Sequence, residues 1–62
     1  MIKFIITDEL LFTNYIYFKD EFELDMYDSL NELIFKNINL NNKFIYEIDE
    51  SENIFKVNKK YK

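Results

Sequence analysis

The sequence predicts a small α+β domain with the element order ββ(β)αββ, in which one helix packs across one face of a mainly antiparallel sheet of about four strands. Two observations predict this fold. Apolar and polar side chains alternate in several short segments, and one central stretch repeats its apolar residues at helical spacing. With 62 residues, 48% of them hydrophobic, the chain has room for one core. We place that single domain at residues 1–57, followed by a basic C-terminal tail at 58–62.

The N-terminal third is predicted to contain two strands. Residues 1–7 alternate, and Ile5 adds an apolar side chain to the second face of that strand. The run at 10–18 fits either a helix capped by Thr7 or a strand rich in Tyr, Ile and Phe, which have high β propensity. We favour a strand over about 12–18 that pairs with the first strand.

A turn at 19–20 leads into a short extended segment. Charged and apolar residues alternate from Glu21 to Asp25, so Phe22 and Leu24 are predicted to point inward. Their charged neighbours would then project from the opposite side, about 6.7 Å apart by strand rise.

One helix is predicted over about 26–37. Its start has two candidates, near Asp25 or near Ser29, because each has an acid three residues later, as in a capping box. Four asparagines between 37 and 42 indicate the end of the helix. In a chain without Gly, Asn is the natural residue for the left-handed position that follows a helix.

The C-terminal third is predicted to form a hairpin. Residues 43–49 alternate clearly, with Phe44, Tyr46 and Ile48 on one side. A polar turn follows at 50–53, and a last strand at 54–57.

Charge is distributed unevenly along the chain. All twelve acids precede residue 56, whereas four of the eight lysines lie after residue 55. One stretch, 20–32, carries six acids and no base. These acids are predicted to engage Lys and Arg side chains of a partner, as a row of phosphates would, with further help from Glu47, Asp49, Glu50 and Glu52. The predicted contact acids are Asp20, Glu21, Glu23, Asp25, Asp28 and Glu32.

The plainer interpretation of the acids is that they face water, or that Asp25 and Asp28 complement the dipole of the helix N-terminus. Together, Tyr15, Tyr17, Tyr46 and Tyr61 offer more amphipathic surface than one small core can absorb, and Tyr is enriched in the centres of interfaces. Tyr15, Tyr17 and Tyr46 are therefore candidate anchors for a partner, although they would serve equally well in the core.

Catalysis and metal binding find little support in the sequence. The chain contains no Cys and no His, and both of its serines have cap or turn contexts that explain them. Asp49, Ser51 and Asn53 occupy the first three ligand positions of a calcium loop, but Ile54 and Lys60 stand where that loop needs Gly and Glu. We therefore expect no enzyme, no metal and no cofactor.

Residue types with A/T-rich codons dominate the sequence, and Gly, Ala, Arg and Pro are absent, which indicates an A/T-rich bacterium or a phage or plasmid in one. We expect a cytoplasmic protein, in the host cell if a phage encodes it. The favoured function is a small inhibitor, of the anti-CRISPR or another anti-defence type, that acts on a host protein with a basic nucleic-acid-binding surface. The alternative is a structural or regulatory homodimer with a solvated acidic surface. Neither direct nucleic-acid binding nor a membrane is expected.

Overall fold

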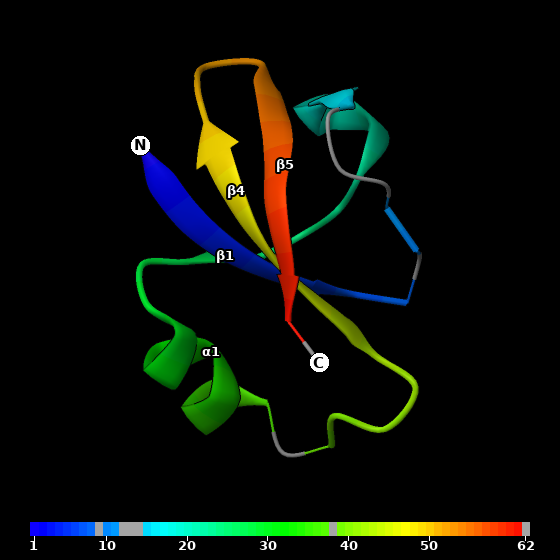
Figure 1. The fold of residues 1–62 in the computed structure, drawn as a ribbon, viewed down its shortest axis with the longest axis vertical. Helices are drawn as coiled ribbons and strands as arrows, with labels where there is room; N and C mark the ends of the chain where they lie inside the picture. The colour runs from blue at the N-terminus through cyan, green and yellow to red at the C-terminus, as the bar shows by residue number, and fades with distance from the viewer. Residues whose placement is uncertain (9, 12–14, 38, 62) are drawn as a thin grey trace.

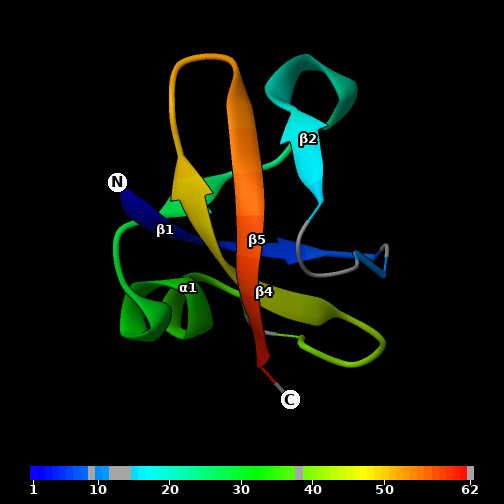
Figure 2. The same ribbon diagram turned by 45° about the horizontal axis from the view of Figure 1, so that its top comes forward.

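The computed structural model describes all residues except 9, 12–14, 38 and 62. Within these described residues, five strands form one antiparallel sheet in the order β2-β5-β4-β1-β3, with one α-helix beside it (Figures 1 and 2). The predicted α+β class is confirmed, with five strands in place of about four. The elements are β1 (Ile2–Thr7), β2 (Ile16–Phe18), the 3-10 turn η1 (Lys19–Glu21), β3 (Met26–Tyr27), α1 (Leu30–Lys36), β4 (Phe44–Glu50) and β5 (Ile54–Tyr61).

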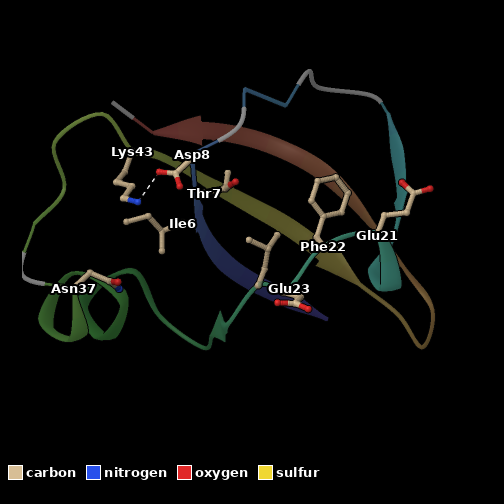
Figure 3. A pocket seen from close by; sticks show the side chains of 9 residues that line it. Ile6, Thr7, Asp8, Glu21, Phe22, Glu23, Asn37 and Lys43 are labelled. Carbon is tan, nitrogen blue, oxygen red and sulfur yellow. Dashed lines mark hydrogen bonds and ion pairs between the residues drawn. The ribbon is translucent and has the colours of Figure 1, made fainter.

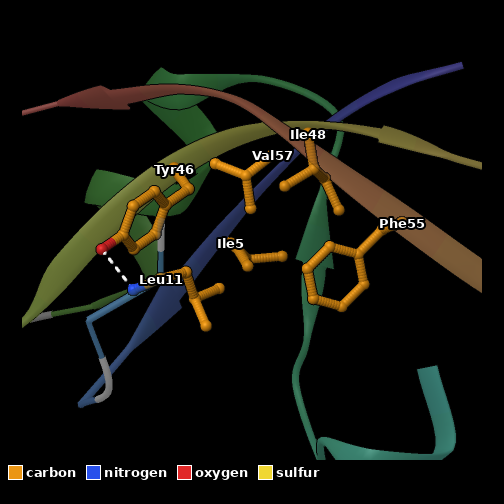
Figure 4. Packing of buried hydrophobic residues seen from close by; sticks show 6 residues of the cluster. All are labelled: Ile5, Leu11, Tyr46, Ile48, Phe55 and Val57. Carbon is orange, nitrogen blue, oxygen red and sulfur yellow. Dashed lines mark hydrogen bonds between the residues drawn. The ribbon is translucent and has the colours of Figure 1, made fainter. Parts of the chain in front are cut away.

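The hydrophobic core lies on one face of the three central strands. β1 and β4 pair from Ile2 opposite Asp49 to Thr7 opposite Phe44, which places Ile5 and Tyr46 side by side on the same face. The face of β1 that carries Ile5 is therefore the face that packs in the core. Figure 4 shows six side chains gathered there: Ile5, Leu11, Tyr46, Ile48, Phe55 and Val57.

The helix α1 lies against β1 and β3 on the opposite face of the sheet. Tyr27 pairs with Phe4, so the Tyr27 side chain lies on the face of the sheet opposite to Ile5. The Tyr27 hydroxyl accepts a hydrogen bond from the Asn37 side-chain amide at the end of the helix. Leu33 is the fully buried residue of α1, whereas the next two residues, Ile34 and Phe35, are exposed.

Strand β2 corrects the expected pairing. It pairs with β5, from Ile16 opposite Lys56 to Phe18 opposite Ile54, and not with β1. Leu11 explains the difference: it is buried in the core cluster and its N–H donates to the Tyr46 hydroxyl, so the chain after β1 crosses the core face toward β5. Residues 12–14 of the predicted strand lie outside the described residues.

The helix begins later than predicted, because Met26 and Tyr27 form β3 against Ile5 and Phe4 of β1. Ser29, the second candidate, is the N-cap: its Oγ accepts a hydrogen bond from the Glu32 N–H at 3.1 Å. The predicted end is confirmed, since α1 ends at Lys36. Asn37 is not left-handed, however, and the positive φ of the described residues belongs to Asn42, at 61°, in the turn before β4.

Residues 58–61 of the predicted basic tail instead form the second half of β5, and residue 62 lies outside the described residues. A register shift between Glu47 and Ile48 lets the ladder continue, with Lys60 opposite Tyr46 and Tyr61 opposite Ile45. The Tyr61 hydroxyl donates to Glu47 Oε1 at 3.2 Å. Residues 58–61 therefore belong to the folded domain, and their lysines alternate between the two faces of the sheet.

Candidate partner-binding surface

The six predicted contact acids are all exposed, but they come from several elements and do not form the predicted continuous stripe. Asp20 and Glu21 belong to η1, and Asp28 lies in the bend before Ser29. Glu32 is in the first turn of α1. Asp25 and Asp28 precede α1, so neither shares a face of the helix with Glu32.

The alternation predicted for residues 21–25 is present. Phe22 and Leu24 are half-buried and pack against the core cluster, while Glu21, Glu23 and Asp25 are exposed. The apolar side chains thus fix an extended segment whose acids point outward, although this segment pairs with no strand until β3 begins at Met26.

Ion pairs separate the acids into two groups. Four pairs form among the described residues: Asp28 with Lys3, Asp8 with Lys43, Glu50 with Lys19, and Asp49 with the N-terminal amine. Within the same residues, Glu32 forms no ion pair, and neither do Asp20, Glu21, Glu23 and Asp25, which lie in one short segment. We call these four residues the acidic surface, because they carry unneutralised negative charge within one short segment.

Two pKa shifts follow from the ion pairs. The hydrogen bond from the Lys3 ammonium to Asp28 raises the pKa of Lys3 above its ordinary value. The Lys19 ammonium, whose Nζ lies 2.7 Å from Glu50 Oε2, lowers the pKa of the Glu50 carboxyl. Asp28 and Glu50 are thus each committed to a lysine of this chain, which makes them weaker candidates for contact with a partner than the acidic surface.

A groove of about 360 Å³ lies beside the acidic surface (Figure 3). Ile6, Phe22 and Leu24 give it apolar walls. Its charged side chains are mainly negative, since the single base, Lys43, is already paired with Asp8. This groove fits a Lys or Arg side chain of a partner. The aliphatic stem of that side chain contacts the apolar walls, and its positive charge lies near the acids at the rim. The remaining lining residues are Thr7, Glu21, Glu23 and Asn37.

The three candidate tyrosines differ in accessibility. Tyr46 is fully buried, so it cannot anchor a partner, and its assignment to the binding surface is corrected. Tyr17 is half-buried, and its ring stacks on Phe55 with centroids 5.4 Å apart. Tyr15 is 59% exposed and is the candidate that remains on the surface.

Sequence reasoning missed three exposed apolar side chains, Ile16, Phe18 and Phe35, which are 60%, 56% and 84% exposed. For the two β2 residues a signal was available. They alternate with Tyr17, which stacks in the core, so they must lie on the other face of the strand.

The described residues contain no group of three metal-ligating side chains. In the part of the chain that the structure describes, no helix combines the length and hydrophobicity needed to cross a membrane. No protein-family model, curated protein or solved structure matches this chain. The surface chemistry is therefore the basis for a functional proposal.

Proposed function

We propose that this protein is a non-enzymatic protein-binding module that inhibits a nucleic-acid-handling protein. Its acidic surface occupies the partner's basic groove in place of nucleic acid. The inhibitor is of the kind that a phage or mobile element uses against a host defence system, such as a CRISPR effector. The alternation of Glu21, Glu23 and Asp25 with the anchored Phe22 and Leu24 carries the proposal.

The geometry supports this proposal in two ways. The packing of Phe22 and Leu24 against the core cluster holds the exposed Glu21, Glu23 and Asp25 in place before a partner arrives, which lowers the entropic cost of association. The four acids of the acidic surface form no ion pair among the described residues, so Lys and Arg of a partner need not displace a lysine of this chain.

The test is capture from a lysate of an A/T-rich bacterium at low and at high salt, followed by release with added DNA. Mimicry predicts that the captured protein binds nucleic acid, that DNA releases it, and that capture weakens steeply with salt. Glu21→Gln with Glu23→Gln should weaken binding at least about tenfold, which corresponds to about 1.4 kcal/mol.

The matched control is Asn31→Lys with Asn41→Lys, which raises the net charge by the same amount at exposed positions outside the acidic surface. If this control weakens binding as much as the Gln pair, only net charge matters and the acidic surface is not the contact. Capture that DNA does not reverse would reject mimicry.

A further inference from the structure

One hydrogen bond shows which main-chain groups of β2 face β5 and which face the edge of the sheet. The Lys19 N–H donates to the Asn53 carbonyl at 2.8 Å, so the main chain of Lys19 faces β5. In an antiparallel ladder successive residues face alternate sides, so Tyr17 also faces β5. The N–H and C=O groups of Ile16 and Phe18 therefore point away from β5, toward the edge of the sheet.

The same two residues present the most exposed apolar side chains of the sheet's β2 edge. Ile16 and Phe18 lie on one face of β2, opposite Lys56 and Ile54 of β5. Figure 2 shows β2 beside β5 at this edge. Natural edge strands are usually protected from pairing with another chain by very short length, a charge, a proline or a bulge; β2 is only three residues long, but it contains no charged residue and no proline.

We propose that β2 pairs with β2 of a second copy of this chain, antiparallel and centred on Tyr17. This register places Ile16 of each copy opposite Phe18 of the other. These are the residues whose main-chain groups face the edge, so each of the two pairs exchanges both of its hydrogen bonds. The side chains of the same pairs meet on one face, as a favourable aromatic and β-branched combination.

Charge favours the antiparallel arrangement of the two copies. Asp20 and Glu21 follow β2 after Lys19 and are the first two residues of the acidic surface. In the antiparallel register centred on Tyr17, the two η1 turns lie at opposite ends of the paired strands, so the two acidic surfaces are not brought together. A parallel pairing would bring the acids together.

Ile54 adds to the apolar contact between the two copies. Ile54 pairs with Phe18 inside each copy and is partly exposed on the same face. Joining the two edges therefore forms one apolar strip that runs from Ile54 of one copy to Ile54 of the other. The contact does not use the acidic surface, and either proposal can fail without the other.

The test is light scattering over a dilution series of the full chain. The mass should rise with concentration from 7.7 kDa toward twice that value. Ile16→Lys with Phe18→Lys should stay monomeric throughout. The matched control, Ile34→Lys with Phe35→Lys, makes the same chemical change at two exposed positions of α1 and should dimerise as the natural protein does. Circular dichroism shows that each variant is folded.

Amide hydrogen exchange tests the register itself. Exchange at the Ile16 and Phe18 amides should slow as the concentration rises, whereas the Tyr17 amide, which faces β5, should not change. A chain that remains monomeric at millimolar concentration would overturn the proposal. So would a dimer in which the Ile16 and Phe18 amides exchange at an unchanged rate, or one that forms equally well with both lysines in β2.

Discussion

The Leu11 N–H donates a hydrogen bond to the Tyr46 hydroxyl at 2.8 Å inside the core. Both residues are buried, and they lie 35 positions apart in the sequence. The bond gives the Leu11 N–H a partner where the main chain crosses the core face. It also gives a partner to the Tyr46 hydroxyl, which has no access to water. It therefore explains why a Tyr, and not a Phe, occupies the centre of β4.

Replacing Tyr46 by Phe removes the acceptor and leaves the Leu11 N–H buried without it. We expect a loss of about 1–3 kcal/mol in the free energy of unfolding. Tyr61→Phe is the control, because the Tyr61 hydroxyl donates to Glu47 near the surface, where water replaces the lost partner. Urea denaturation measures both, and equal losses would contradict the role given to the core bond.

Ser29→Ala tests the position of the helix start. The variant removes the Oγ that accepts from Glu32 N–H, and we expect a loss of about 1 kcal/mol in stability. Asp25→Ala, at the other candidate cap, should cost less, because Asp25 precedes β3 and lies outside the helix. Thermal or urea unfolding measures both variants. A larger loss for Asp25→Ala would mean that the helix begins earlier.

The sequence predicts elements better than it predicts their partners. Phe44, Tyr46 and Ile48 alternate with Ile45, Glu47 and Asp49, so local periodicity is enough to assign β4 and the face that carries Tyr46. The partner of β2 depends on Leu11 reaching Tyr46, a contact between distant residues that no local pattern contains.

The residues of the candidate site also divide into those that a local pattern predicts and those that depend on contacts between distant residues. Outward acids at 21, 23 and 25 follow from alternation and were predicted, whereas the pairing of Asp28 with Lys3 depends on β3 lying beside β1. The start of the helix was ambiguous because both capping boxes are locally acceptable, and pairing of Met26 with Ile5 decides between them. Tyr46 could not be separated from Tyr15 because a tyrosine suits a core and a surface equally well.

Lowering the pH should reduce the stability of the folded protein, partly because Glu50 becomes protonated. Lys19 lowers the Glu50 pKa below the ordinary 4.5, so the folded state binds this proton less readily than the unfolded state does. The resulting stability is present above pH 4.5 and is lost as the pH falls through the lower, folded-state pKa. Glu50→Gln should thus be less stable than the natural protein near neutral pH, and the difference should shrink on acidification.

Urea unfolding at a series of pH values measures this difference. Glu52→Gln is the control, since Glu52 is an exposed neighbour that forms no ion pair among the described residues. A gap between natural protein and Glu50→Gln that stays constant from neutral to acidic pH would show that the carboxylate charge does not contribute.

Truncation after Val57 tests whether the C-terminal residues belong to the fold. It removes the strand positions opposite Ile45, Tyr46 and Glu47 of β4. We expect a loss on the order of 2–4 kcal/mol, because each main-chain hydrogen bond contributes about 0.5–1.5 kcal/mol and the buried Tyr46 loses its neighbour.

Lys59→Gln with Lys60→Gln is the control for truncation, because it removes the two charges and keeps the main chain of β5. It should cost no more than about 0.5–1 kcal/mol per substitution, the usual contribution of an exposed cation–π contact, because Lys59 lies over the Tyr61 ring and Lys60 over the Phe44 ring. Urea denaturation of both proteins separates the contribution of the backbone from that of the charges. A truncated chain as stable as the full one would mean that residues 58–61 are a tail after all, and that Tyr46 is held in the core by Ile5 and Leu11 alone.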